Sequence, residues 1–435
     1  MNIALAKTET GRVVETIFSA ARDRLPGTAK VGETRQRAFE TYERAGLPNR
    51  RVEEWKYTDL RVLLREVKPL ALEPDAPAIK RAKTALKSVA IKGGAIRLVL
   101  VDGAFVPELS DAAPAGVSVG SLRAALEKGE SELLETNVKD AMVSLNAALA
   151  TDGVLVGIVD GTALARPLQV IHVATSASAS GFTRSQLKIG RGARVTLVEN
   201  FIAAEGAKAY QAYDALLLSI GDGAELTQVR LMADSTEAAN ITSAIINVGA
   251  KVKFNLFNMT AGGAVSRYQG FVSLDGQGSE LNINGVNLLK GTQHGDTTLL
   301  VDHAVPQCTS RELFRAVIDD RAHSVFQGRI IVRPDAQKTD GKMMTRALLL
   351  SDEAEADNKP ELEIFADDVT CGHGATAGAL DESLLFYLRA RGLSEKAAQA
   401  MLIQAFVGEA IEGIADDDLR EAVMAVAARW LEARA

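Results

Sequence analysis

The chain has 435 residues and a formal net charge of −7, from 56 acidic and 49 basic side chains. Hydrophobic residues make up 47% and charged residues 24% of the chain, which is typical of a globular protein of two or three domains or of one elongated core. The acidic balance argues against nucleic acid as the main partner, because binding to phosphates requires a basic surface.

The cysteine content excludes a protein held together by disulfide bonds and a chain that binds an iron–sulfur cluster through four cysteines of its own. Cys308 and Cys371 are the two cysteines, too few for a disulfide framework or for a Cys₄ iron–sulfur site within one chain. No apolar run approaches the roughly 18–20 residues of a membrane helix. The segment Met1–Arg12 carries Lys7 and Glu9 and lacks the continuous apolar stretch of a signal peptide. We therefore expect a cytoplasmic protein that does not bind a membrane, with no tightly bound cofactor in the isolated chain.

Residues 1–152 predict an N-terminal domain of helical and mixed character. Helical spacing of apolar residues covers Gly11–Asp23 and Gln36–Ala45, and returns over Leu122–Ala150. An alternating apolar strand covers Ala95–Asp102. Between the helices and the strand lies Arg50–Leu60, an amphipathic segment whose aromatic residues we expect to dock on the core.

Residues 153–378 have a different pattern, in which short alternating strands follow glycine-rich cassettes. Taking Gly192, Gly223, Gly249 and Gly278 as markers, the cassettes recur at steps of 31, 26 and 29 residues. Such a repeat predicts a β-solenoid, because one coil cannot bury its apolar strand faces until coils stack on it. A β-sandwich is the alternative, but two-residue Asn-Gly or Asp-Gly hairpins between paired strands are almost absent.

Residues 379–435 predict a C-terminal helical domain of three short helices. Ser383 and Ser394 are suitable N-caps for the first two helices, and the acidic run Asp416–Asp418 precedes the third. The apolar faces of these helices either pack on one another or form a helical surface that binds a partner.

Cys371 and His373 are the first candidate site. On an extended strand, positions i and i+2 point to the same face, so a thiolate and an imidazole could meet one metal ion or one sulfur species there. The structural alternative is a buried thiol in the last coil with a histidine hydrogen-bonded nearby.

Two further groups of residues give weaker signals. His294, His303, His323 and Cys308 do not show the tight ligand pairs of zinc sites, so we expect surface histidines at coil corners. The Gly190-Arg191-Gly192 cassettes precede strands, whereas phosphate-binding loops open helices. The chain is therefore not expected to bind or hydrolyse ATP.

Two stretches resemble the SufD family, scaffold subunits of the SUF iron–sulfur cluster assembly system. The run Asp357–Gly392 is similar to the C-terminal signature of that family, and Arg51–Thr58 is similar to the R-x-E-E-W-K-Y-T segment near the N-terminus of SufD and its sister subunit SufB. The resemblance implies a right-handed parallel β-helix flanked by helical N-terminal and C-terminal regions.

The resemblance also implies partners and site residues. It implies a complex in which SufB meets the solenoid near its C-terminal end and the ABC-type ATPase SufC docks on the helices after Asp381, with a possible homodimer when the chain is isolated. His373 then helps to hold a transient iron–sulfur cluster or iron at the SufB interface, with Cys371 as a weaker candidate. The candidate residues for SufC docking are Leu384, Phe386, Tyr387, Leu402 and Phe406. A SufD-type subunit is not expected to turn over a substrate.

Two alternatives stay open on the sequence. A SufB-type subunit shares the architecture, but it tends to have His-Glu-Ala-Thr where this chain has Cys371–Thr376, and it carries more cysteines. An enzyme on a β-helix is the other alternative. Lyases of that kind are usually exported, and acyltransferases need a strict hexapeptide period that is missing here.

Overall fold

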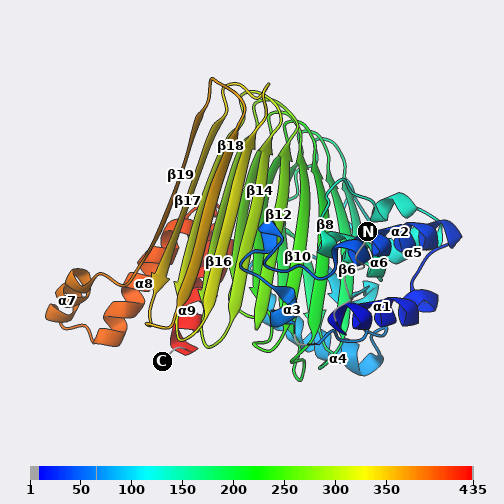
Figure 1. Ribbon diagram of the computed structural model, residues 1–435, viewed down its shortest axis with the longest axis horizontal. Helices are drawn as coiled ribbons and strands as arrows, with labels where there is room; N and C mark the ends of the chain where they lie inside the picture. Colours follow the sequence, from blue (N-terminus) through cyan, green and yellow to red (C-terminus); the bar gives the residue numbers. More distant parts are fainter. Residues whose placement is uncertain (1–8, 65, 434–435) are drawn as a thin grey trace, which may run out of the picture.

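The molecule is a long stack of β-strands with helices at both ends. The computed structural model describes residues 9–64 and 66–433, so residues 1–8 of the Met1–Arg12 segment lie outside the described residues. The N-terminal helices lie at one end of the stack and the C-terminal helices at the other (Figure 1).

The strands form two sheets that alternate along the chain. Sheet A has the order β18-β16-β14-β12-β10-β8-β6-β4-β3, and sheet B has the order β19-β17-β15-β13-β11-β9-β7-β5-β1-β2. From β4 to β19 each strand pairs in parallel with the strand two positions along the chain, which gives about eight coils. The predicted solenoid is confirmed, and the sandwich alternative is wrong because antiparallel pairing is limited to β1–β2 and β3–β4 among the described strands.

The bounds of the strands are β1 Ile96–Val101, β2 Ala104–Phe105, β3 Val117–Ser121, β4 Val154–Ile158, β5 Leu168–Ala174, β6 Ser180–Ile189, β7 Arg194–Ala203, β8 Gln211–Ile220, β9 Glu225–Ala233, β10 Ala239–Val248, β11 Lys253–Thr260, β12 Val265–Leu274, β13 Glu280–Leu289, β14 His294–His303, β15 Thr309–Ile318, β16 His323–Val332, β17 Asp340–Leu349, β18 Glu355–Ile364 and β19 Thr370–Gly378.

The glycine cassettes are explained by the backbone conformation at one corner of each coil. Gly192, Gly223 and Gly278 have φ values of 63°, 67° and 75°, a left-handed conformation that costs other residues free energy. In the coil between Gly223 and Gly278 this position is held by Lys251, with φ 54°. Gly249, the marker chosen on the sequence, was therefore wrong by two residues. The steps between these corner positions are 31, 28 and 27 residues, as in the strand register Arg194, Glu225, Lys253 and Glu280.

The interior of the solenoid is aliphatic over most of its length. Side chains from both sheets form one continuous cluster that runs from β1 to β17, including Leu98, Leu197, Leu256, Ile283 and Ile330. In the ladders Leu197 pairs with Leu168, and Leu256 pairs with Ile283 of the next coil. The low aromatic content of the chain is consistent with a core that repeats small aliphatic layers.

The N-terminal part packs mainly on the outer face of sheet A, and its Ala82 and Leu86 pack on Val99 and Ile171 of the outer face of sheet B. The six helices α1–α6 span Glu9–Ala21, Ala29–Ala45, Leu60–Leu63, Ala76–Ala85, Leu122–Glu127 and Ala141–Leu149. Phe18, Phe39 and Leu145 of α1, α2 and α6 form a second core with Phe182 and Tyr213 of sheet A. The single helix predicted over Leu122–Ala150 is wrong, because α5 and α6 are separated by a turn and by the 3₁₀ helix Ser131–Leu134.

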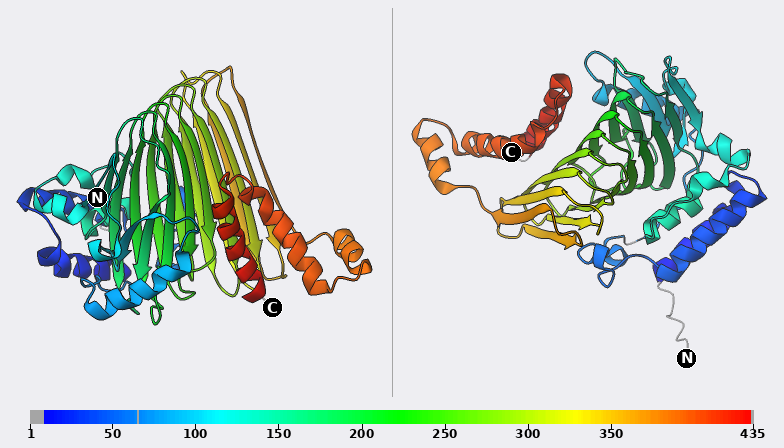
Figure 2. Two further views of the ribbon diagram at one scale, coloured as in Figure 1. Left: turned by 180° about the vertical axis from the view of Figure 1, so that it is seen from behind. Right: turned by 90° about the horizontal axis from the view of Figure 1, so that it is seen from above.

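The C-terminal helices run back along sheet B. They are α7 Glu382–Ala390, α8 Glu395–Ile411 and α9 Asp417–Ala433. Ile403 and Val407 of α8 and Val423 of α9 pack on Val286 and Val317 of the outer face of sheet B. Figure 2 shows the two C-terminal helices against this sheet from behind. Within residues 9–64 and 66–433, no helix is long and apolar enough to cross a membrane.

The first C-terminal helix begins two residues earlier than the sequence suggested. The carboxylate of Asp381 accepts hydrogen bonds from the backbone N–H groups of Ser383 and Leu384, so Ser383 is not the N-cap as predicted. Ser394 caps α8 as predicted. Because α7 lies beyond the last strand, it projects from the body of the molecule (Figure 1).

Candidate functional site

The last coil is open on one side. β18 and β19 are the end strands of their sheets and pair on one side only within the described chain. Such an edge exposes a row of backbone N–H and C=O groups to pairing with another chain. Two large apolar side chains, Ile364 and Phe365, are 42% and 59% exposed at the end of β18. The open end therefore has both the polar and the apolar features of a surface that another β-structure can cover.

Cys371 and His373 lie on this open coil. Within the ladder that joins β17 and β19, Cys371 pairs with Gly341 and His373 pairs with Met343. Met343 belongs to the interior core, so both Cys371 and His373 are on the inner face of their strand. Cys371 is half-buried against that core, and His373 is exposed where the next coil would lie.

The two side chains differ in their readiness to bind a metal ion. Burial raises the pKa of the Cys371 thiol above its ordinary value, so the thiol is protonated at neutral pH. His373 presents an imidazole to the solvent without any such burial. The accessible ligand on this coil is therefore His373, and Cys371 needs a change of surroundings to bind as a thiolate.

Polar side chains lie beneath the open coil, in a part of the core that is mostly hydrophobic. Glu312 pairs with Met343 in the ladder and is 2% exposed. Burial raises the pKa of its carboxyl to about 8, and neither oxygen accepts a hydrogen bond from the described residues. Next to it, Ser310 is within 3.0 Å of Nε2 of His303.

The two stretches that carry the sequence resemblance meet in space. Lys359 of β18 forms an ion pair with Glu53, which lies in the 3₁₀ helix Glu53–Trp55. Arg329 lies 3.7 Å from a carboxylate oxygen of Glu54 and 3.4 Å from one of Glu361. The N-terminal segment therefore lies against the outer face of sheet A beside the last coil.

The same segment is anchored deeper in the molecule, as predicted for its tryptophan. Trp55 is 1% exposed, and its ring lies 3.7 Å below the guanidinium carbon of Arg267. Arg267 is ion-paired with Asp296, and both side chains are fully buried. The Asp296 carboxylate also accepts a hydrogen bond from Thr58.

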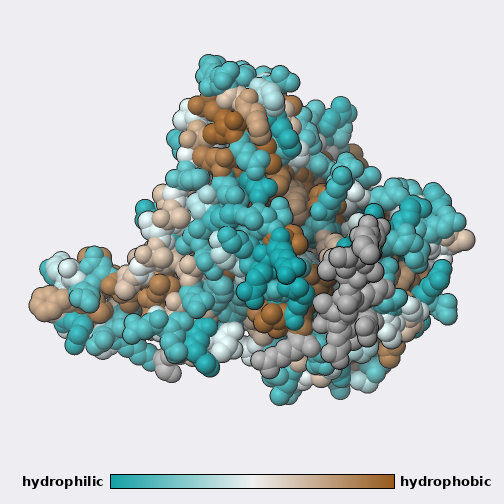
Figure 3. Space-filling model, viewed as in Figure 1, coloured by the Kyte–Doolittle hydropathy of each residue, from teal (hydrophilic) through white to brown (hydrophobic). Residues whose placement is uncertain are grey.

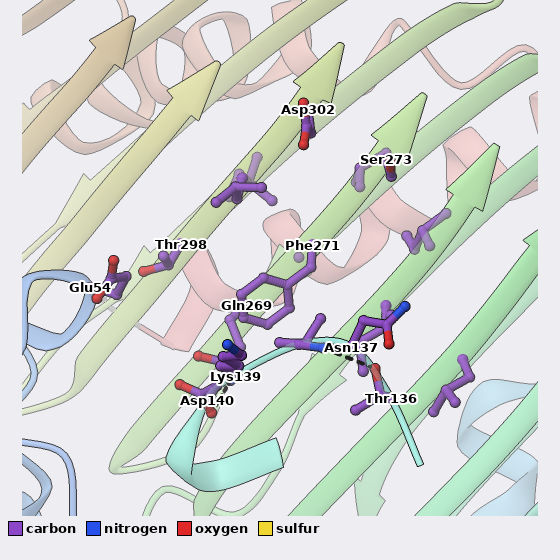
Figure 4. A pocket seen from close by; sticks show the side chains of 18 of the residues that line it. Glu54, Thr136, Asn137, Lys139, Asp140, Gln269, Phe271, Ser273, Thr298 and Asp302 are labelled. Atoms are coloured by element: carbon purple, nitrogen blue, oxygen red, sulfur yellow. Dashed lines mark hydrogen bonds between the residues drawn. The ribbon is translucent and has the colours of Figure 1, made fainter. Parts of the chain in front are cut away.

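A groove with a volume of about 1050 Å³ lies between this segment and sheet A (Figure 4). Phe271 and Gln269 rise from β12 beneath the loop that carries Thr136–Asp140. The Asp140 carboxylate caps α6 and accepts hydrogen bonds from Trp55 and Gln269. This carboxylate therefore holds together the elements that form the groove.

The structure separates the candidate residues for SufC docking into two groups. Leu384, Phe386 and Tyr387 on α7 are 51%, 74% and 51% exposed, and Figure 3 shows apolar atoms on this projecting helix. Leu402 on α8 is half-buried. Phe406 is half-buried against the core beneath α8, with the Arg315 guanidinium 5.4 Å from its ring centre.

Two histidines of the second set, His294 and His303, are not at the surface, which corrects the sequence-based prediction. His294 is 5% exposed and His303 and Cys308 are fully buried. His294 lies on the outer face of sheet A, where Oγ1 of Thr58 is 2.9 Å from its Nε2. His323 is partly exposed and lies 2.8 Å from Asp357. Sequence patterns did not indicate that the N-terminal segment covers this face.

A further polar cluster inside the solenoid was missed altogether. His172 of β5, Glu199 of β7 and Asp214 of β8 each offer one ligand atom, and these atoms lie within 4.8 Å of one another. Burial lowers the pKa of His172 to about 4 and raises that of Asp214 to about 6. The available signal was a charged residue at an inner-face position of each strand, which becomes visible only once the strand register is known.

These features define a β-solenoid protein with an open, histidine-bearing end. Residues 172–406 match the family described as "SUF system FeS cluster assembly, SufBD core domain", and residues 16–170 match the SufBD N-terminal region. The chain therefore belongs to the SufBD family of the SUF iron–sulfur cluster assembly system.

Three relatives illustrate the range of similarity. The iron–sulfur cluster assembly protein SufD of Escherichia coli is 31% identical over 88% of this chain and 89% of its own length. A SufBD family protein of Synechocystis is 28% identical, over 87% of this chain and 86% of its own length. SufD of Bacillus subtilis is 26% identical over 66% of each chain.

Proposed function

We propose that this chain is the SufD-type scaffold subunit of a complex with a SufB-type sister subunit and a SufC-type ATPase. The open last coil is the observation that carries the proposal, because it combines free strand edges, exposed apolar side chains and His373 on one surface. The sister solenoid covers this coil, and a transient iron–sulfur cluster or iron binds where the two chains meet. A second copy of the chain can occupy the same edges when the sister is missing.

Three observations support the finer parts of this proposal. The chain has two cysteines and the half-buried thiol of Cys371 is protonated, so most ligands for a cluster come from the sister chain. Similarity to the SufD of Escherichia coli favours SufD over SufB. Cys308 and Cys371 are both free thiols, which suits a cytoplasmic location. The scaffold itself turns over no substrate in this proposal.

We also propose a division of roles along the chain. Residues 1–152 brace the outer face of sheet A, residues 153–378 form the rigid core that carries the open end, and residues 379–435 bind the ATPase. The exposed apolar side chains of α7 support the last assignment, because a helix that projects with Phe386 74% exposed suits docking to a partner.

The first test concerns His373 in the assembled complex. We expect His373→Ala to lower the iron and sulfide content of the complex with SufB and SufC without dissolving it, because the imidazole is a ligand and not part of the core. The measurement is a pull-down after co-expression, followed by anaerobic iron and sulfide analysis. His323→Ala is the matched control, since His323 lies on the outer face of sheet A.

Two results would contradict this assignment. If the His373→Ala complex keeps its full iron and sulfide content, His373 is structural. If the wild-type chain forms no complex with SufB and SufC, the SufD-type proposal itself is wrong.

The second test concerns the docking of the ATPase. We expect Phe386→Asp to remove SufC from the purified complex while SufB stays bound, because a charge at this exposed position opposes an apolar contact. The control is Phe406→Ala, which should lower the melting temperature instead, since Phe406 packs against the core beneath α8. Retention of SufC by the Phe386→Asp variant would count against α7 as the docking helix.

A further inference from the structure

His172, Glu199 and Asp214 gather on the inner face of the solenoid, near its N-terminal end. His172 and Glu199 come from sheet B and Asp214 comes from sheet A, so the cluster bridges the two sheets across the interior. β5 and β19 are separated by seven strand spacings in sheet B, which amounts to roughly 33 Å. The cluster is therefore distinct from the open coil that carries His373.

Each of the three side chains has an atom left over for a ligand. Oε2 of Glu199 accepts hydrogen bonds from Arg230 and Gln228 at 3.1 and 2.5 Å, which leaves Oε1 free. Oδ1 of Asp214 accepts a hydrogen bond from Thr183 at 2.5 Å, which leaves Oδ2 free. The His172 side chain is 13% exposed, and neither of its ring nitrogens makes a hydrogen bond to the described residues.

The surrounding residues hold these ligand atoms in place. The His172 ring stacks on Phe201 at a centroid distance of 4.4 Å, which fixes the plane of the imidazole. Arg230 and Gln228 orient the Glu199 carboxylate, in the way that outer-shell hydrogen bonds orient metal ligands. His172 Nδ1 is 3.9 Å from Asp214 Oδ1, the oxygen that accepts the hydrogen bond from Thr183, and this separation is too long for a hydrogen bond. Two tetrahedral ligands on one ion at about 2.0–2.2 Å are roughly 3.3–3.6 Å apart, so ion binding would draw these side chains slightly closer.

Space and charge also suit a cation. A cavity of about 50 Å³ borders His172 and Asp214, but not Glu199, and reaches Asp102 and Asp234, so an ion or a water molecule has room beside the cluster. Arg230 is ion-paired with Glu199, whereas no lysine or arginine among the described residues forms an ion pair with Asp214. The charges of Arg230 and Arg184 act on Asp214 only from a distance, and a buried carboxylate without a direct partner is costly.

We propose that His172, Glu199 and Asp214 bind one divalent transition-metal ion inside the solenoid. One imidazole and two carboxylates form a nitrogen and oxygen ligand set, which suits ions such as Fe²⁺, Mn²⁺, Co²⁺ or Zn²⁺ and not the soft ions that prefer thiolates. The ion supplies the missing positive charge and ties sheet A to sheet B in the first coils.

The test uses Co²⁺ as a spectroscopic probe on the purified full chain, with anaerobic equilibrium dialysis of Fe²⁺ alongside. We expect one ion per chain and no thiolate-to-cobalt charge-transfer band. His172→Phe keeps the aromatic stack and Asp214→Asn keeps the shape of the carboxylate. Each variant should lose at least the roughly 10- to 100-fold in affinity that outer-shell changes cost.

Two controls separate this site from others. Asp357→Asn removes the carboxylate of the exposed His323–Asp357 pair and should leave binding unchanged. The double variant Cys371→Ser with His373→Ala lacks the ligands of the open coil, and an ion that is lost in this variant but kept by the triad variants would contradict the proposal. Circular dichroism identifies any variant that fails to fold, and Glu199→Gln then replaces it. Unchanged affinity in the folded triad variants, or no bound ion in the wild-type chain, would overturn the proposal.

Discussion

Arg267→Ala is expected to lower the free energy of unfolding by about 3–5 kcal/mol, the usual cost of removing one partner from a buried ion pair. The substitution leaves the carboxylate of Asp296 buried without its cation. It also removes the guanidinium that lies over Trp55 and donates a hydrogen bond to the Glu54 carbonyl at 2.7 Å. The measurement is denaturant unfolding followed by circular dichroism, and the tryptophan emission should move to longer wavelength as Trp55 is exposed.

Two comparisons make this expectation specific. Arg333→Ala breaks an exposed pair with Asp302 and should cost less than about 1 kcal/mol. The double variant Arg267→Met with Asp296→Leu should recover most of the loss, since an apolar pair can replace a buried ion pair. If Arg267→Ala costs no more than Arg333→Ala, the N-terminal segment is not anchored through this pair.

Glu312→Gln is expected to stabilise the chain increasingly as the pH rises. Burial raises the pKa of this carboxyl from 4.5 to about 8, so between these values the folded state holds a proton that the unfolded state has released. The wild-type stability is therefore fully present below pH 4.5 and is lost progressively as the pH approaches 8. At about 1.36 kcal/mol per pKa unit, the difference between the variant and wild type should grow by up to roughly 5 kcal/mol.

The measurement compares unfolding curves of the two proteins between pH 5 and pH 8. Glu280→Gln is the control, because this glutamate is exposed at the start of β13, and it should change the stability by less than about 0.5 kcal/mol. A constant difference between the Glu312→Gln variant and wild type across this range would show that the buried carboxyl keeps an ordinary pKa.

The repeat of the coils could be predicted from the sequence only in those coils whose corner position is a glycine. Gly192 and Gly223 are in the left-handed conformation for which glycine is selected. Lys251, Gln307 and Lys338 have the same conformation, with φ between 54° and 63°, but their sequence carries no mark of it. Stacking on neighbouring coils imposes the conformation at these positions, so the sequence shows fewer repeats than the structure contains.

The candidate sites also differ in whether the sequence alone can reveal them. The pairing of Cys371 and His373 on one face follows from local strand geometry, and two neighbouring residues suffice to see it. His172, Glu199 and Asp214 come from three strands, and they meet only through the register of the ladders. Likewise, the burial of His294 depends on Thr58, 236 positions away in the sequence. Contacts between distant coils are set by packing, which composition and spacing do not encode.

The open last coil has a consequence for the lifetime of the free chain. In a stacked-coil protein the stability of each coil is approximately a sum of its own contribution and those of the interfaces with its neighbours. The last coil has one such interface, so local opening at β18 and β19 needs less free energy than opening in the middle. A bound partner adds the second interface and raises that opening energy by mass action. The supply of the sister subunit would then set how long an unassembled chain resists proteases.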